Sequence, residues 1–180
     1  MKPEKDLLEL SRKVIQSHFK NQKVEVSDKI KKKYSEKQAC FVTLTKNGNL
    51  RGCVGSLYAH QPLYKDVIDN TINAAFNDYR FTPLSESELS CIKIEISVLS
   101  VAKKLDFSSS DELLKKLNHN MGVILKKGSY SATYLPQVWE ELPDKIEFLS
   151  SLCLKAGLPS DSWKREGIEV YTYTVEKVKE

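Results

Sequence analysis

The sequence lacks long apolar runs, and no stretch approaches the ~20 consecutive apolar residues that a membrane-spanning helix requires. Its first residues, 1–6, are largely charged and lack the apolar segment of a secretory signal. These two absences lead us to expect a cytoplasmic protein that does not interact with a membrane.

Cysteine is scarce and widely spaced. The four residues are Cys40, Cys53, Cys91 and Cys153, with neither a CxxC pair nor a Cys/His quartet among them. This spacing excludes the usual ligand patterns of a structural zinc site. In a reducing cytoplasm we expect four free thiols, with Cys91 and Cys153 buried in apolar strand and helix settings.

Established catalytic motifs are also missing. The sequence has no glycine-rich phosphate loop, no Ser/His/Asp signature, no HExxH and no three-cysteine motif of radical S-adenosylmethionine enzymes. We expect the chain to hold no metal and no organic cofactor of its own.

The excess of positive charge is small. The net charge is +4, and the clearest basic run is Lys29–Lys33. Only Tyr34 adjoins this run as an aromatic residue, and Asp28 and Glu36 flank it. A nucleic-acid site needs a broader basic face with stacking partners, so the pattern favours a solvated basic turn.

The composition, 41% hydrophobic and 29% charged residues, is that of a folded domain. The length suits a single domain over residues 1–180, and the boundary of any small subdomain cannot be read from the sequence. Periodicity predicts helices over 3–20, 62–78, 110–117 and 143–156, and strands over 38–45, 49–57, 91–101, 122–126, 129–135 and 168–175. This order predicts an α+β fold with a mainly antiparallel sheet of about six strands flanked by helices.

Asn47-Gly48 is a strong signal for a two-residue hairpin turn, because both residues tolerate positive φ. An uninterrupted register from that turn would place Arg51 opposite Leu44 and Cys53 opposite Val42. We expect these four side chains and Cys40 to share one face of the hairpin. Because both faces are substantially apolar, we expect a central, largely covered hairpin.

The return strand contains Leu50-Arg51-Gly52-Cys53-Val54-Gly55, which does not suit an ordinary strand. Two glycines in a hairpin arm mark a bulge, a bend or close approach by another group. In a functional interpretation, Arg51 favours the Cys53 thiolate or forms a small anion site with the backbone amides. In a structural interpretation, the glycines admit a helix, Cys53 fills a gap and Arg51 pairs with a carboxylate. The residues alone leave both open.

This segment closely resembles the signature hexapeptide of the AMMECR domain family, with valine where isoleucine is usual. The other resembling segments lie in the same order along the chain: 41–44, 62–63, 74–75, 78–81, 83–84, 94–100, 135–139, 155–159 and Trp163. The sequence departs from the family at 119–122, where His-Asn-Met-Gly stands in place of Gly-x-Asp/His-Gly. The resemblance therefore implies no role for that loop.

The resemblance implies an α+β fold and, for bacterial and archaeal members, association with a Memo-like protein and a radical S-adenosylmethionine protein. It also implies a sheet covered on both sides. A partly buried Glu95 would then need a cation, which Arg51 or Arg80 could supply. Asp78 and Arg80 match the family's Asp-x-Arg-Phe element, as a structural pair or as part of the site.

The candidate site follows from these segments. Its catalytic candidates are Cys53 and Glu95, and its substrate-binding candidates are Arg51, Gly52, Gly55, Asp78 and Arg80. His60 lies outside the resembling segments, so we expect a solvated loop histidine. The first functional hypothesis is a modifying or accessory enzyme acting with those two partners on a small molecule or biopolymer. The alternative is a non-catalytic regulatory module that binds a peptide, nucleotide or nucleic acid.

Overall fold

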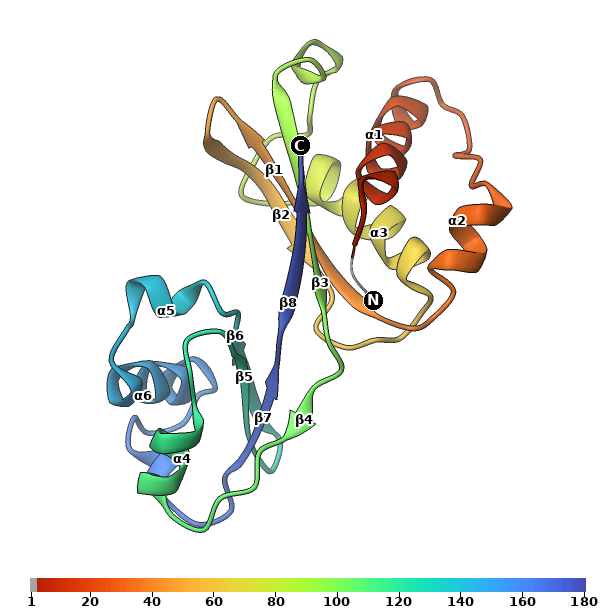
Figure 1. Cartoon of the computed structure of the whole chain (residues 1–180). Coiled ribbons are helices and arrows are strands. Elements are labelled where there is room, and N and C mark those ends of the chain that lie inside the picture. The colour runs from red at the N-terminus through yellow and green to blue at the C-terminus, as the bar shows by residue number, and fades with distance from the viewer. Residues whose placement is uncertain (1–2) are drawn as a thin grey trace. The chain divides into compact units, whose positions relative to one another are not determined.

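A computed structural model describes residues 3–180 and divides the chain into two compact units (Figure 1). Unit 1 comprises Met1–Ser100 with Glu176–Glu180, and unit 2 comprises Val101–Val175. The single domain expected over residues 1–180 thus contains two packing units, each with its own hydrophobic core. Among residues 3–180, no helix is long and apolar enough to cross a membrane.

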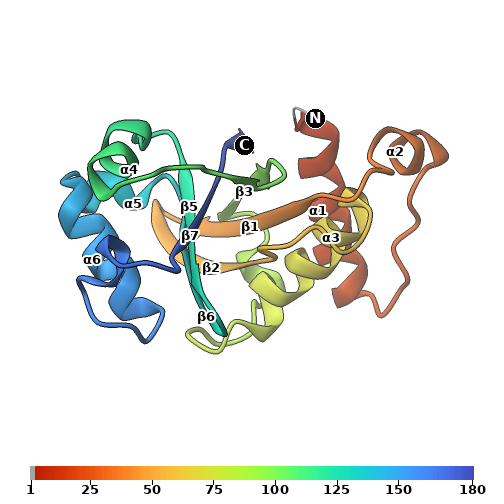
Figure 2. The ribbon, with the colours of Figure 1, turned by 90° about the horizontal axis from the view of Figure 1, so that it is seen from below.

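Unit 1 is a four-stranded sheet with helices packed on one face. Its elements are α1 (Lys5–Phe19), α2 (Asp28–Lys33), β1 (Ala39–Lys46), β2 (Asn49–Gly55), α3 (Leu63–Ile72), β3 (Ile92–Leu99) and β8 (Val175–Lys179). A π-helical segment, Asn73–Asn77, continues α3, and a short 3-10 helix, Glu86–Glu88, precedes β3. The strand order is β2-β1-β3-β8, and α1 and α3 lie on the same side of the sheet (Figure 2).

The inner face of this sheet packs against those helices. The apolar positions of β1 and β3 alternate as expected for one buried face, and their side chains form a core with the apolar stripes of α1 and α3. The fully buried residues include Leu7, Ile15, Cys40, Val42, Leu44, Leu63, Val67, Ile94 and Ile96. Thr71 donates to Ser11 at 2.9 Å, which ties the two helices together inside the core.

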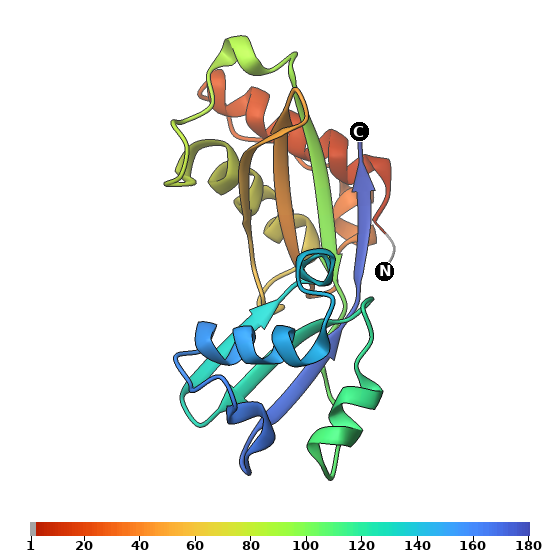
Figure 3. The same ribbon diagram turned by 90° about the vertical axis from the view of Figure 1, so that its left-hand side faces the viewer.

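Unit 2 is a second four-stranded sheet with a separate core. Its elements are β4 (Lys103–Lys104), α4 (Ser110–Lys116), β5 (Gly122–Lys127), β6 (Tyr130–Tyr134), α5 (Val138–Glu141), α6 (Lys145–Lys155) and β7 (Glu169–Tyr173). The strand order is β4-β7-β5-β6, and α6 lies across the strands (Figure 3). Trp139 stacks on Phe148 at 3.5 Å between ring centroids, and this pair anchors α5 and α6 in the core.

The structure confirms the expected α+β class with antiparallel pairing, but in two four-stranded sheets. The strands that the sequence did not indicate as separate elements are β4, of two residues, and β8, which follows β7 almost without interruption. The strand predicted over 168–175 contains β7, and after a break at Thr174 the chain continues into β8, of which residues 176–179 were not predicted as strand.

The hairpin of β1 and β2 contains the predicted turn but not the predicted register. Asn47 and Gly48 have φ of 52° and 80°, as a two-residue turn with positive φ at both positions requires. A bulge then shifts the pairing, so that Leu44 lies opposite Gly52 and Thr43 opposite Cys53. The expected pairing of Val42 with Cys53 was therefore wrong, because one extra residue on β2 reverses every later side chain.

This shift changes where the cysteines lie. Cys40 faces the core and is fully buried, whereas Cys53 faces the opposite side of the sheet and is partly exposed. The hairpin is not central either, because β2 is an edge strand. All four cysteines are free, but Cys91 is exposed and not buried as expected, since β3 begins one residue later.

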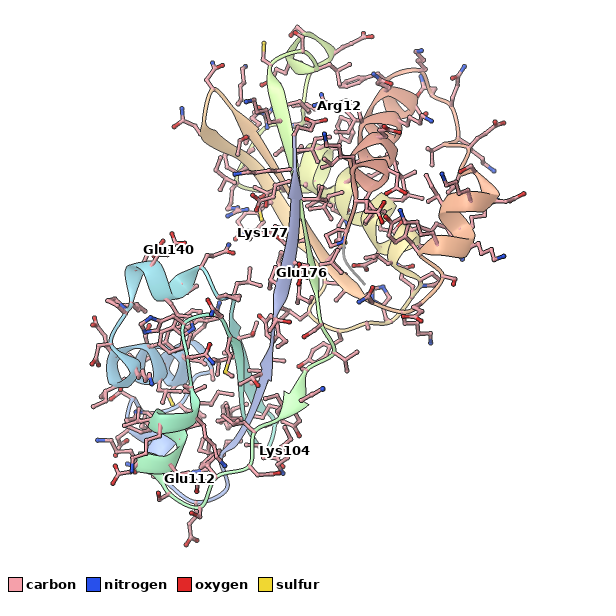
Figure 4. The ribbon with its side chains drawn as sticks, in the orientation of Figure 1. Arg12, Lys104, Glu112, Glu140, Glu176 and Lys177 are labelled. Carbon is pink, nitrogen blue, oxygen red and sulfur yellow. The ribbon has the colours of Figure 1, made fainter. Side chains whose placement is uncertain are left out.

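Arg12 of α1, labelled in Figure 4, binds Glu180, the residue that follows β8. Arg12 donates to the carbonyls of Leu89 and Ile92 at 2.7 and 3.0 Å and also pairs with the carboxylate of Glu180. The same carboxylate accepts from the Ile94 amide at 3.0 Å. One guanidinium therefore connects α1, the start of β3 and the last residue.

We expect Arg12→Ala to lower the stability of unit 1 by about 1–3 kcal/mol, because two carbonyls and a carboxylate lose a charged donor. In a chain of this size, that corresponds to a melting temperature lower by roughly 2–10 °C, measurable by circular dichroism. Lys5→Ala on the exposed side of α1 is the control and should change little. An unchanged melting temperature for Arg12→Ala would show that the docking of β8 does not depend on this contact.

Candidate functional site

Cys53 lies on the face of the unit 1 sheet opposite α1 and α3, which we call the outer face. The neighbouring side chains on this face are Phe41 and Thr43 of β1, with Glu95 opposite Thr43 on β3. The Thr43 hydroxyl and the Cys53 thiol lie 3.2 Å apart and form a hydrogen bond. Thr43 was not predicted as a site residue, because an uninterrupted register would place it on the other face from Cys53.

Glu95 shares the outer face with Cys53 but does not touch it. Thr43 stands between them, and two strand spacings place their backbones about 10 Å apart. Glu95 pairs with Lys177 of β8 at 3.3 Å, with side-chain exposures of 30% and 44%, and Figure 4 shows Lys177 on that strand. The expected partners, Arg51 or Arg80, were wrong because both guanidinium groups are held elsewhere.

Arg51 does not lie beside the Cys53 thiol. Its Nε and Nη2 donate to the two carboxylate oxygens of Glu88, each at 3.0 Å, and the side chains are only 13% and 14% exposed. Lys46 adds a further contact to Glu88 at 2.9 Å. Chiefly because of the Arg51 hydrogen bonds, the pKa of Glu88 lies well below its ordinary value. The structural interpretation of Arg51 was the correct one.

The two glycines of the signature admit close neighbours. A Cβ at Gly52 would lie 2.1 Å from the carbonyl oxygen of Ala74 in the π-helical segment. A Cβ at Gly55 would lie 2.3 Å from the ring of Phe41, which therefore covers this part of the outer face. Neither glycine can be replaced without moving β2. Both therefore serve the close packing of their neighbours against this strand.

Asp78 and Arg80 hold the backbone of Cys53. The Cys53 amide donates to Asp78 Oδ2 at 2.9 Å, and Arg80 Nη2 donates to the Cys53 carbonyl at 3.0 Å. The two side chains form a bidentate pair, with Arg80 Nη2 at 2.7 Å from Oδ2 and Nε at 3.0 Å from Oδ1. This pair occupies the N–H and C=O that an edge strand would otherwise leave free.

Arg80 is the cation that contacts Cys53, through the backbone carbonyl. The hydrogen bonds from Arg80 hold the pKa of the buried Asp78 carboxyl well below its ordinary value. The hydrogen bond to Asp78 in turn raises the pKa of Arg80, and the charge of a Cys53 thiolate adds a smaller contribution. By contrast, burial raises the pKa of the Cys40 and Cys153 thiols.

A buried polar network at the far end of the hairpin was not predicted. Asp66 of α3 is 1% exposed and accepts hydrogen bonds from the Cys40 amide, Ser56 and Asn70 at 2.9, 2.8 and 3.0 Å. It fixes the first turn of α3 against both strands. The sequence signal was available: an acidic residue on the apolar stripe of a helix must have buried donors. His60 is exposed, and its Nε2 lies 3.8 Å from Asp66 and not beside Cys53.

Within residues 3–180, no group of three or more His, Cys, Asp or Glu side chains is arranged to hold a metal ion. Around Cys53, the outer face carries the Thr43 hydroxyl and the ion pairs of Asp78 with Arg80 and of Glu95 with Lys177. Such a set can bind polar groups, and it places a nucleophilic atom on the surface of a rigid sheet.

These features define a two-unit α+β protein with a cysteine fixed on a strand edge. The AMMECR1 family model matches residues 8–178, and the chain belongs to this family. Protein NEQ441 of Nanoarchaeum equitans is 40% identical over 93% of this chain and 95% of its own length. Protein MK0488 of Methanopyrus kandleri is 38% identical over 97% and 86%, respectively. The crystal structure of uncharacterized protein PH0010 from Pyrococcus horikoshii matches with a TM-score of 0.84 and 33% identity, over 98% and 90% of the two chains.

The carboxylates of Glu88 and Glu95 should respond differently to replacement by alanine. Glu88→Ala leaves Arg51 and Lys46 without their shared partner and should cost about 2–3 kcal/mol of unfolding free energy. Glu95→Ala removes a partly solvated pair and should cost no more than about 0.5–1 kcal/mol. Urea unfolding of both variants at pH 7 measures the difference. Equal costs would contradict the largely buried pairing of Arg51 with Glu88.

The Asp78 pair should produce a defined pH dependence. Its folded-state pKa is depressed, so its contribution to stability is complete above the ordinary carboxyl value and declines as the pH falls below about 4. We expect Asp78→Asn to be less stable than wild type at pH 7 by about 2–3 kcal/mol. That difference should shrink as the pH falls below about 4, because the Asp78 carboxyl takes up a proton in the unfolded chain while it stays ionised in the folded protein. A difference independent of pH would show that the charge of Asp78 does not stabilise the edge.

Proposed function

We propose that this chain is a cytoplasmic modifying or accessory enzyme whose reactive group is the Cys53 thiol. The observation that supports this most strongly is the pair of hydrogen bonds that Asp78 and Arg80 make to the Cys53 backbone. A gap-filling cysteine requires no such fixation. A nucleophile does, because its reaction rate depends on holding the reacting atom in one position.

The surroundings of the thiol suit that role. Arg80 donates to the Cys53 carbonyl at 3.0 Å, so a cationic side chain lies beside this residue and could contact a negatively charged substrate group. The Thr43 hydroxyl at 3.2 Å can hydrogen-bond to the thiolate or to a substrate atom. Glu95 and Lys177, about 10 Å along the same face, would contact the far end of a metabolite-sized substrate or a biopolymer segment. Glu95 is thus a binding group in this proposal and not the base beside the thiol.

The proposal includes the two partners that the resemblance implies. A Memo-like protein and a radical S-adenosylmethionine protein would supply metal and radical chemistry that this chain has no motif to perform. Membership of the AMMECR1 family supports this part of the proposal. The substrate would be a small molecule or a biopolymer presented to the outer face.

A second candidate function is a non-catalytic binding module for a peptide or nucleotide. The observation that favours it is the pairing of the charged groups: Glu88 binds Arg51, and Lys177 binds Glu95. Among the described residues, these pairs leave no free carboxylate next to Cys53 to act as a general base. In that case the fixed edge of β2 and the adjacent Tyr79, which is 96% exposed, would form a recognition surface.

Thiol labelling separates the two functions. With limiting iodoacetamide at neutral pH, we expect Cys53 to react faster than the more exposed Cys91, and Cys40 and Cys153 to react last. Arg80→Gln should slow Cys53 to about the rate of Cys91, because the guanidinium that contacts the Cys53 backbone is removed. Arg51→Ala is the matched control and should leave the rate unchanged, since that side chain reaches Glu88 and Pro83 and not Cys53.

Peptide mapping by mass spectrometry gives the four rates, and a melting curve for each variant verifies that it is folded at the labelling temperature. Complementation then tests catalysis directly: a deletion strain should accumulate a metabolite that the wild-type gene removes and Cys53→Ser does not. If Cys53 reacts more slowly than Cys91 and Cys53→Ser complements fully, the enzyme proposal falls. The binding module then remains.

A further inference from the structure

A hollow of about 700 Å³ lies on the solvent side of α1, away from the outer face. Helix α1 ends at Phe19, and residues 20–27, the returning segment, lead from it to α2 without helix or strand. Residues of both pieces line the hollow: Lys13, Gln16 and Ser17 from α1, and Lys20, Gln22, Lys23, Val24 and Glu25 from the returning segment. Its volume falls in the range of small-molecule sites.

The lining is basic, and its cations are not neutralised. Within residues 3–180, Lys13, Lys20 and Lys23 make no ion pair, whereas Lys33 of α2 binds two carboxylates at 2.7 and 2.8 Å. Glu25 is the single carboxylate of the lining and lies in no ion pair there. Three lysines and one glutamate give the lining a formal charge of +2. Among the described residues, no carboxylate forms an ion pair with these lysines.

The spacing of the lysines suits a ligand with more than one negative group. Lys13 on α1 and Lys20, the residue that follows its end, are seven residues apart, which corresponds to about 10 Å along the helix axis. Lys23, further along the returning segment, lines the same hollow. Gln16 and Ser17 lie between the first two lysines and offer neutral donors and acceptors for hydroxyl or ester oxygens.

We propose that this hollow binds a small polyanion that carries two or more phosphate groups. Lysine binds phosphate as a point charge, and three lysines around one hollow provide several such contacts. The lining contains no aromatic side chain on which a nucleobase could stack, so the geometry favours a polyphosphate or a phosphorylated polyol over single-stranded nucleic acid. The site is separate from Cys53, since α1 covers the opposite face of the sheet.

Tripolyphosphate is the probe that tests this proposal, by isothermal titration of the full chain at about 50 mM salt, where surface electrostatics are little screened. We expect one binding site per chain, with affinity that falls as salt is raised. Lys20→Glu/Lys23→Glu should weaken binding at least about tenfold, because two attractions become two repulsions. Lys29→Glu/Lys32→Glu on α2 is the matched control, with the same change in net charge on exposed lysines outside the hollow.

Three outcomes overturn the proposal. Equal weakening in both double variants would mean diffuse surface charge and not a site. The absence of measurable binding to the wild-type chain would remove the hollow as an anion site. Binding of a single-stranded RNA oligonucleotide that is lost in the Lys20/Lys23 variant, while tripolyphosphate does not bind, would assign the surface to nucleic acid instead. The rate of Cys53 labelling should be the same in every variant, so this test is independent of the proposed thiol chemistry.

Discussion

The bidentate ion pair of Asp78 and Arg80 is the interaction on which the outer face depends. It binds the amide and the carbonyl of Cys53, the two backbone groups that an edge strand would otherwise expose. A neighbouring strand would satisfy the same groups, but it would also pair with every second residue of β2. A single ion pair closes the edge at one position only and leaves the thiol of that residue accessible. The edge is thereby protected from unintended strand pairing without being buried.

The bulge in β2 accounts for the arrangement of the other signature residues. One extra residue between the turn and Gly52 turns Cys53 toward the outer face and lets Gly52 face the Ala74 carbonyl. Arg51, next to the bulge, reaches Glu88. Without the bulge, a glycine would lie on the outer face and Cys53 would point at the helices, where no space exists for its side chain. The signature thus encodes one local backbone geometry that serves packing on one face and exposure on the other.

How much of this could be predicted depends on the range of the interactions. Local signals indicated the hairpin turn at Asn47-Gly48, the helices α1, α3, α4 and α6 and the special geometry of Gly52 and Gly55, but not the short helices α2 and α5. The register failed because a bulge follows from the whole ladder and from the contact with Ala74, which lies 22 residues further along the chain. The predicted pairing of Glu95 with Arg51 or Arg80 was wrong for a similar reason. Glutamate and lysine residues usually lie in solvent, so the sequence does not mark Glu88 and Lys177 as partners. Only the folded unit brings Glu88 beside Arg51 and Lys177 beside Glu95.

Lys177 also shows how the two units are related in sequence. In sequence order, β8, the last strand of the unit 1 sheet, follows the whole of unit 2, because it begins at residue 175. The outer face is therefore incomplete until the last strand is docked, and the Arg12 contacts hold that strand at its end. The loop-closure entropy of inserting unit 2 grows only slowly with its length, so a few well-placed contacts suffice to offset it. Any partner that binds the outer face near Lys177 would then stabilise the docked strand, and a variant that weakens the Arg12 contacts should weaken such binding without altering Cys53 itself.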